Sequence, residues 1–266
     1  AAETNPSIRM QPASGTGESW RVSLFGGLRF IKGQDEVRSI RWKRRKAQEL
    51  FLFLLLQHRY RCVKDLAAET LQMGDDPDKS ASAVYVIVHQ LKQTLLQELG
   101  IREGVSVKEG VIFLREDAIE YVDVERYLVL VRVADQLWMK DRDLSAEMYQ
   151  EAYMMYGELL PEHPYLPWLD TIREHLLEKQ ISVIRKCCKL AEDGNDVLLL
   201  EGYLQEWIRL RPYQEEAYRK LIELFMKTDR RREAELIYER WSELCRDELG
   251  IEPSQQLRRL LEGFRR

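Results

Sequence analysis

The apolar residues in the second half of the chain recur at intervals of 34 positions. From residue 123 onward every periodic segment has the spacing of an α-helix, so the repeating unit is helical. The matched pairs are Leu200 and Ala234, Leu204 and Tyr238, Trp207 and Trp241, Ile184 and Tyr218, Cys187 and Leu221, and Ala191 and Phe225. A helical repeat of this length cannot bury its apolar face alone, and it therefore predicts stacked helix pairs.

A period of 34 residues is that of tetratricopeptide units. Pro212 falls where such units usually carry a proline, and a less regular unit upstream has Tyr149 and Ala152 at the matching places. The segment 161–167, which holds three prolines, interrupts the array as a loop. The alternative is an ordinary helical bundle in which the spacing is a coincidence.

The first half of the chain has a different order of elements. Residues 20–25, 28–31 and 37–40 alternate like three short antiparallel strands. Helices are expected at 42–58, where Ala47, Leu50, Phe51, Leu54 and Leu55 share a face, and at 64–71. The acidic turn 74–78 includes Pro77, which suits a helix start.

The segment 79–99 predicts a two-sided helix that ends before Gly100. Its apolar side holds Val84, Ile87, Val88, Leu91 and Leu95. Two β-rich runs follow, 105–108 and 111–114, around the Glu109-Gly110 turn, and they indicate a hairpin. Strands, three helices and a hairpin in this order predict a winged helix-turn-helix. The fold class expected for the whole chain is therefore mostly α: an α+β winged helix followed by an all-α, tetratricopeptide-like domain.

Composition places limits on the function. The chain has 266 residues, of which 45% are hydrophobic and 32% charged, as in a globular protein with ordinary cores. Residues 1–119 hold 18 Lys and Arg against 15 Asp and Glu, whereas residues 120–266 hold 23 against 30. The basic half is therefore the one expected to contact nucleic acid. The domains expected are a linker or tag at 1–18, a winged helix at 19–119 and the helical domain at 120–266, with a boundary near 116–123.

Several classes of protein are not favoured. The longest apolar run, 50–56, is too short to cross a membrane, and no secretion signal opens the chain, which predicts a cytoplasmic protein. The chain begins without Met, so we expect either an engineered start or a fragment of something longer. No metal or cofactor site is expected, and Cys62, Cys187, Cys188 and Cys245 are predicted to be buried thiols. The four histidines and the serines lie in no catalytic motif, which argues against an enzyme.

Several segments resemble one known family. Residues 40–51 (IRWKRRKAQELF) and 79–95 (KSASAVYVIVHQLKQTL) look like the first and recognition helices of regulators with a bacterial transcriptional activator domain, the antibiotic-regulatory-protein type. Residues 123–127 (DVERY), 157–168 (GELL through Trp168) and 248–254 (ELGIEPS) are similar to landmarks of the activator domain itself. The resemblance covers residue 20 to the end of the chain.

The resemblance implies a function and a set of partners. It implies an OmpR-type winged helix that binds direct-repeat double-stranded DNA, often as a homodimer, and recruits RNA polymerase. The helical domain would serve dimerisation, effector sensing or polymerase contact. Related proteins carry a phosphoacceptor receiver domain, as in two-component signalling, or a large ATPase module, and either would be missing here.

The recognition helix departs from the family pattern. Many relatives carry Thr and Arg on its exposed face, where this chain has Val86, His89 and Gln93. Arg is the commonest reader of guanine, Gln suits adenine and an apolar side chain suits the thymine methyl group. An A/T-leaning or relaxed site is expected, and loss of strong DNA binding is the alternative.

Two sets of residues are predicted to contact DNA. The base-reading face is Ser82, Tyr85, Val86, His89, Gln90 and Gln93. The phosphate contacts are Trp42, Lys43, Arg44, Arg45, Lys46, Lys64, Lys92 and Lys108. Basic residues at a helix start oppose the helix dipole, and an anionic partner would explain them. The alternative for both sets is a solvated polar surface.

Two further interpretations concern the helical domain. The aromatic residues at helical spacing are expected to pack between helices, the alternative being a ligand pocket; they are Tyr149, Tyr203, Trp207, Tyr218, Tyr238 and Trp241. The second candidate function for the chain is a tetratricopeptide-type interaction module in a signalling protein, in which the winged helix docks protein. Such a module has no need of the basic run 43–46.

Overall fold

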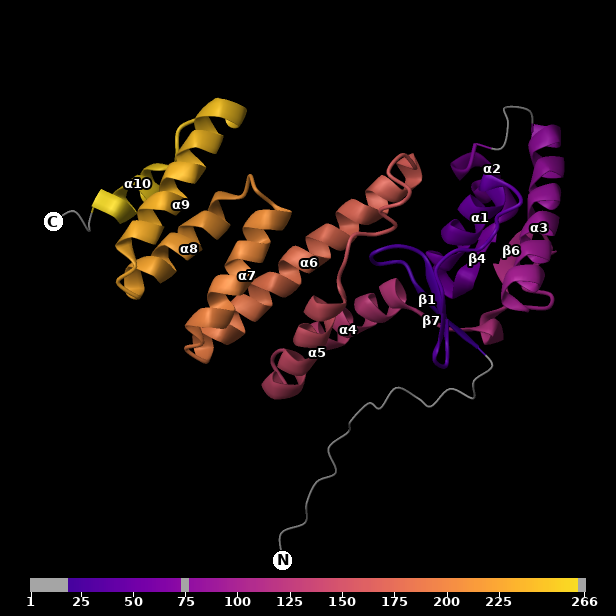
Figure 1. The fold of residues 1–266 in the computed structure, drawn as a ribbon, viewed down its shortest axis with the longest axis horizontal. Helices are drawn as coiled ribbons and strands as arrows, with labels where there is room; N and C mark the ends of the chain where they lie inside the picture. The colour runs from indigo at the N-terminus through magenta and orange to yellow at the C-terminus, as the bar shows by residue number, and fades with distance from the viewer. Residues whose placement is uncertain (1–18, 73–76, 263–266) are drawn as a thin grey trace, which may run out of the picture. The chain divides into compact units, whose positions relative to one another are not determined.

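The computed structural model of the chain describes residues 19–72 and 77–262 (Figure 1). These residues pack into two compact units. Among the described residues, the first unit runs from residue 19 to 129 and includes 155–173, and the second holds 130–154 and 174–262. The described residues are mostly helical, and the strands among them lie in the first unit, as the fold class predicted from the sequence requires. No helix among the described residues is long and apolar enough to cross a membrane.

The first unit begins with a four-stranded sheet in the order β3-β2-β1-β7. Its strands are β1 (Trp20–Ser23), β2 (Arg29–Lys32), β3 (Asp35–Val37) and β7 (Ile119–Val122). β3 lies earlier than the predicted 37–40, because Lys32 pairs with Asp35 across a two-residue turn and fixes the register there. β7, which pairs in parallel with β1, was not predicted.

Three helices follow β3, and Figure 1 shows them gathered beside β4 (Arg61–Val63) and β6 (Val111–Leu114). They are α1 (Arg45–Leu55), α2 (Lys64–Thr70) and α3 (Pro77–Leu99), with a 3-10 turn (His58–Tyr60) and β4 (Arg61–Val63) between the first two. α3 begins at Pro77, the residue that the sequence marks as a helix start.

α1 is shorter than the 42–58 predicted. Arg44 has extended backbone (φ −145°, ψ 143°), so the helix cannot include it, and its carbonyl accepts hydrogen bonds from the amides of Ala47 and Gln48. Lys43 and Arg44 therefore precede the helix. At the other end, Arg59 and Tyr60 adopt positive φ and turn the chain into β4.

The core of this unit forms where α1 and α3 meet the first sheet. Both predicted apolar faces are buried, namely Ala47 to Leu55 on α1 and Val84 to Leu95 on α3. Phe51 of α1 stacks on Phe30 of β2 with 5.8 Å between ring centroids. Removal of these faces from water is what orients α1 and α3, and it fixes which side of α3 remains accessible.

The predicted hairpin is present as β5 (Val105–Lys108) and β6 (Val111–Leu114). Glu109 (φ 50°) and Gly110 (φ 76°) both have positive φ, as a type I′ turn demands. β4 adds a third strand, in the order β4-β6-β5. The carbonyl of Gly110 accepts a 2.7 Å hydrogen bond from the amide of Lys64, so the tip of the hairpin is joined to the start of α2. This is the wing of a winged helix.

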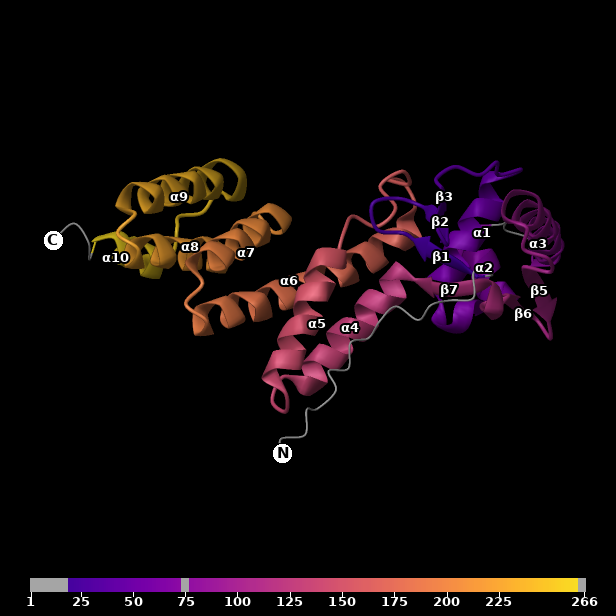
Figure 2. The ribbon, with the colours of Figure 1, turned by 60° about the horizontal axis from the view of Figure 1, so that its bottom comes forward.

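The remaining helices are α4 (Asp123–Leu137), α5 (Arg142–Met155), α6 (Pro167–Asp193), α7 (Val197–Leu210), α8 (Glu215–Lys227), α9 (Arg231–Leu244) and α10 (Gln255–Glu262), with a π-turn (Cys245–Leu249) before α10. α9 repeats α7 with an offset of 34 residues at both ends. α8 packs against α7 and α9, and the three run through the orange and yellow part of Figure 2.

The repeat predicted from the sequence is a packing repeat. All of the paired residues are buried except Tyr238, which is half-buried. The rings of Tyr218 and Trp241 lie 4.6 Å apart, and Trp207 Nε1 donates to Gln214 Oε1 at 2.7 Å. The four thiols are buried and free, and burial raises the pKa of Cys187 and of Cys188 to about 12.

Candidate nucleic-acid interface

One side of α3 is left uncovered by the core. Ser82, Tyr85, Val86 and His89 are exposed, with exposed fractions of 53% for Tyr85 and 47% for Val86. Gln90, Lys92 and Gln93 are half-buried at its margins. The structure therefore places the six residues predicted to read bases on one surface or its edge.

The start of α2 and the wing lie beside this surface. Lys64 Nζ is 5.6 Å from the centre of the Tyr85 ring, a cation–π contact between α2 and α3. Lys108, at the end of β5, is exposed and lies 5.9 Å from the Phe113 ring. Neither lysine forms an ion pair with any residue in the described part of the chain.

The basic run before and within α1 divides into two kinds of residue. Arg45 Nε and Lys46 Nζ lie 2.9 and 2.8 Å from the carboxylate of Glu49, whose side chain is only 3% exposed. Lys46 Nζ also donates to the carbonyl of Leu71 at 2.6 Å, at the end of α2. Lys46 thus joins α1 to α2. Arg44, in contrast, is exposed and has no ion-pair partner among residues 19–72 and 77–262.

The other predicted phosphate contacts are held within the protein. The Trp42 ring packs 5.6 Å from that of Phe51 and covers the core. Lys92 forms an ion pair with Glu103. Lys43 Nζ donates to Gln93 Oε1 at 2.8 Å, and Gln93 Nε2 lies 2.8 Å from His89 Nε2. The sequence could not show the contact of Lys43 with Gln93, since these residues lie 50 positions apart.

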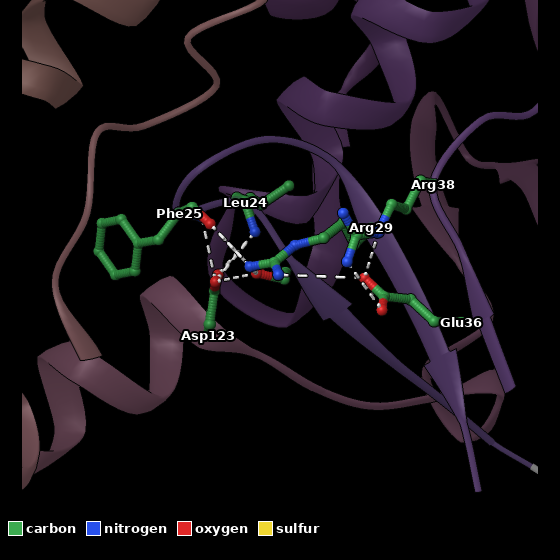
Figure 3. Close-up of polar contacts among 7 residues, drawn as sticks. Leu24, Phe25, Arg29, Glu36, Arg38 and Asp123 are labelled. Atoms are coloured by element: carbon green, nitrogen blue, oxygen red, sulfur yellow. Dashed lines mark hydrogen bonds and ion pairs between the residues drawn. The ribbon is translucent and has the colours of Figure 1, made fainter. Parts of the chain in front are cut away.

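A second cluster was not predicted as a functional feature. The carboxylate of Asp123, at the start of α4, accepts hydrogen bonds from Ser23 Oγ at 2.7 Å and from the amides of Leu24 and Phe25 at 2.9 to 3.0 Å (Figure 3). Arg29 donates to Ser23 Oγ and to the carbonyl of Phe25. Burial raises the pKa of Asp123, and these hydrogen bonds oppose the rise.

The segment that follows α5 packs on the same turn between β1 and β2. The Gly26 amide donates to the carbonyl of Glu158 at 2.8 Å, and the Leu28 amide donates to Glu162 Oε1 at 2.8 Å. Arg173 holds the segment by donating to three carbonyls, those of Leu159, Leu160 and His163. Residues 123–127 and 157–168, noted in the sequence as family landmarks, therefore attach to the winged helix.

Comparison with family models decides which family this is. Residues 122–265, more than half of the chain, match the model of the bacterial transcriptional activator domain. The chain belongs to that family. The family is one of transcriptional regulators rather than a class of enzymes. Within the residues that the structure describes, no group of three or more His, Cys, Asp or Glu side chains could hold a metal ion.

The fold also matches a solved structure, that of Mycobacterium tuberculosis EmbR in complex with a low-affinity phosphopeptide. The match has a TM-score of 0.69 at 19% sequence identity and covers 91% of this chain. The likeness extends over both the winged helix and the helical domain. The chain spans 64% of the length of that structure. A search of curated proteins by sequence finds no match.

Proposed function

We propose that the chain is a DNA-binding transcriptional regulator, of the activator type, that places α3 in a major groove with the wing beside it. The observation that carries this proposal is the uncovered face of α3 in a unit that also holds three cations, Arg44, Lys64 and Lys108, which come from separate elements and have no ion pair among the described residues. Unpaired cations around a helix surface fit the phosphates that flank a groove.

The same proposal covers the partners of the helical domain. We infer a homodimer on direct-repeat DNA, contact with RNA polymerase, and a further module, a receiver or an ATPase, in a longer chain. The domain boundary near residue 119 also stays a prediction. In the structure β7 and the start of α4 pack with the winged helix.

A specific observation favours the second candidate, a protein-interaction module. Val197, Leu198 and Leu199 are exposed in succession at the start of α7, beside a cavity of about 280 Å³ between α6, α7 and α8. An exposed apolar run of this kind suits a protein partner. The two functions differ in one respect, because only the DNA reader needs the cations of the winged helix.

The test is fluorescence anisotropy with duplexes from genomic promoters, at several salt concentrations. We expect binding that weakens steeply as salt rises, and selection from a random library should then enrich a defined site. A folded chain that binds no duplex even at low salt would contradict the DNA-binding proposal and favour the interaction module.

Replacement of Glu49 by Gln should strengthen DNA binding several-fold. The Glu49 carboxylate offsets one of the two positive charges of Arg45 and Lys46, so its loss adds one positive charge to the surface at the start of α1. The slope of binding against salt should steepen by about one. The matched control is Glu36→Gln, which removes a carboxylate paired with Arg29 and Arg38 in the first sheet. Equal effects of the two changes would mean that α1 is not at the DNA surface.

A further inference from the structure

Lys43, Gln93 and His89 form one hydrogen-bonded chain across two elements. Lys43 Nζ lies 2.8 Å from Gln93 Oε1, and Gln93 Nε2 lies 2.8 Å from His89 Nε2. The segment that carries Lys43 is fixed along α3 by a second contact, from the amide of Arg41 to Glu98 Oε2 at 3.2 Å. The position of Lys43 beside the second half of α3 therefore follows from two contacts.

The chemistry of the three groups fixes their orientation. An ammonium group has only donors, so the atom of the Gln93 amide that faces Lys43 has to be its oxygen. The amide nitrogen then faces His89 and donates, which requires His89 Nε2 to accept. With Nε2 as the acceptor, the ring proton of His89 lies on Nδ1. One glutamine thus sets the tautomer of His89 and the position of Lys43.

This arrangement conflicts with adenine reading by Gln93. Each amide atom of Gln93 keeps one further hydrogen-bonding position, but bidentate recognition of adenine also needs the amide plane to follow the base edge, and the bonds to Lys43 and His89 hold that plane in place. Gln93 also lies in the second half of α3, next to the entry into α1. In helix-turn-helix proteins the first part of the recognition helix reads base edges, while the first helix crosses the sugar–phosphate backbone.

We propose that Gln93 is a positioning residue that holds Lys43 and His89 as a pair of donors for one backbone phosphate. The inference rests on the proposed function and refines it. Lys43 keeps two further N–H groups and His89 keeps its Nδ1–H, whereas a phosphate offers only acceptors. Base reading is left to the first half of the exposed face, at Tyr85 and Val86, where apolar surface suits the thymine methyl group.

The first test needs no DNA. Nitrogen NMR of the imidazole should show a single neutral tautomer of His89, protonated at Nδ1, in the whole chain. Gln93→Leu, which keeps the bulk of the side chain and removes its amide, should give a mixture of tautomers. Gln205→Leu, the same change at an exposed position of the other compact unit, is the control and should leave the signal unchanged. A mixture already present in the unsubstituted chain would overturn the inference.

The second test is a double-mutant cycle of Lys43→Ala and Gln93→Leu on a panel of duplexes that differ at one base pair each. We expect each change to weaken binding about 5- to 10-fold on every duplex and to reduce the salt slope by about one. The double variant should bind no more weakly than either single variant. Val86→Ala, in contrast, should alter the order of preference among the duplexes.

The outcomes separate the inference from the function on which it rests. If Gln93→Leu changes the preference at one base pair and its effect adds to that of Lys43→Ala, then Gln93 reads a base and the inference is wrong. If the unsubstituted chain binds no duplex in the panel, the proposed function fails and the phosphate role fails with it. The NMR experiment would still decide whether the hydrogen-bonded chain exists.

Discussion

Asp123→Ala should lower the free energy of unfolding of the first compact unit by about 3 kcal/mol, because several buried donors lose their acceptor at once. The carboxylate takes the hydroxyl of Ser23 and the amides of Leu24, Phe25 and Val124. Burial raises its pKa, so the ion itself is costly to bury. In the variant the alanine methyl group cannot accept a hydrogen bond, so the donors stay buried without a partner. Their cost exceeds the saving from no longer burying the ion.

The measurement is hydrogen exchange of the Leu24 and Phe25 amides together with urea unfolding of the whole chain. Asp123→Asn retains one acceptor oxygen, so its free energy of unfolding should lie between those of Asp123→Ala and the unsubstituted chain. Asp117→Ala is the control, because Asp117 is exposed and pairs only with Arg115, an arrangement of little consequence for stability. Unchanged protection of both amides in Asp123→Ala would show that the turn between β1 and β2 is held by other contacts.

The sequence was sufficient to predict the structure where a pattern depends on residues that are close along the chain. The stripe from Val84 to Leu95 predicted the buried side of α3, and Glu109-Gly110 predicted the turn of the wing, because each depends on neighbours within one element. The 34-residue offset between α7 and α9 was visible for the same reason, since each repeat packs mainly on the next.

The sequence was insufficient where distant residues meet. β7 has four residues, among them Glu120, and becomes a strand only by pairing with β1, about a hundred positions away. Whether Lys43 and Lys46 are free to bind a phosphate depends in part on Gln93 and Leu71, which lie 50 and 25 positions away along the chain, and no periodicity predicts those contacts. Charge runs identify the surface of a protein, but tertiary ion pairs decide which charges remain available.

The family landmarks gain a physical meaning from the same contacts. Asp123, Leu159 and Leu160 hold the turn between β1 and β2, and the Trp168 ring meets Phe53 of α1 edge to face at 5.4 Å. A motif at the start of the activator domain thus belongs, in packing terms, to the winged helix. Removal of the helical domain at residue 119 would therefore uncover the backbone donors of this turn.

The triple variant Arg44→Ala/Lys64→Ala/Lys108→Ala should lose most of the affinity for DNA. Each phosphate contact contributes about 0.9 to the slope of log K against log salt, so three contacts contribute about 2.7, or roughly 500-fold in affinity near 0.1 M salt. Because these cations have no ion pair among the described residues, their removal leaves no carboxylate unpaired there, and the fold should keep its stability.

The control for this experiment is Arg21→Ala/Arg38→Ala/Arg115→Ala, which removes the same charge from the first sheet and the connection after the wing, where Arg115 follows β6. Net charge alone acts on association at long range and would lower the affinity equally in both variants. Contacts at the groove would lower it only in the first, and the salt slope would flatten only there. Anisotropy titrations of the two triple variants therefore distinguish two cases. If α3 lies at the centre of a phosphate-binding surface, the position of the removed charges matters. If the chain binds DNA only through the net charge of its basic half, the position does not matter.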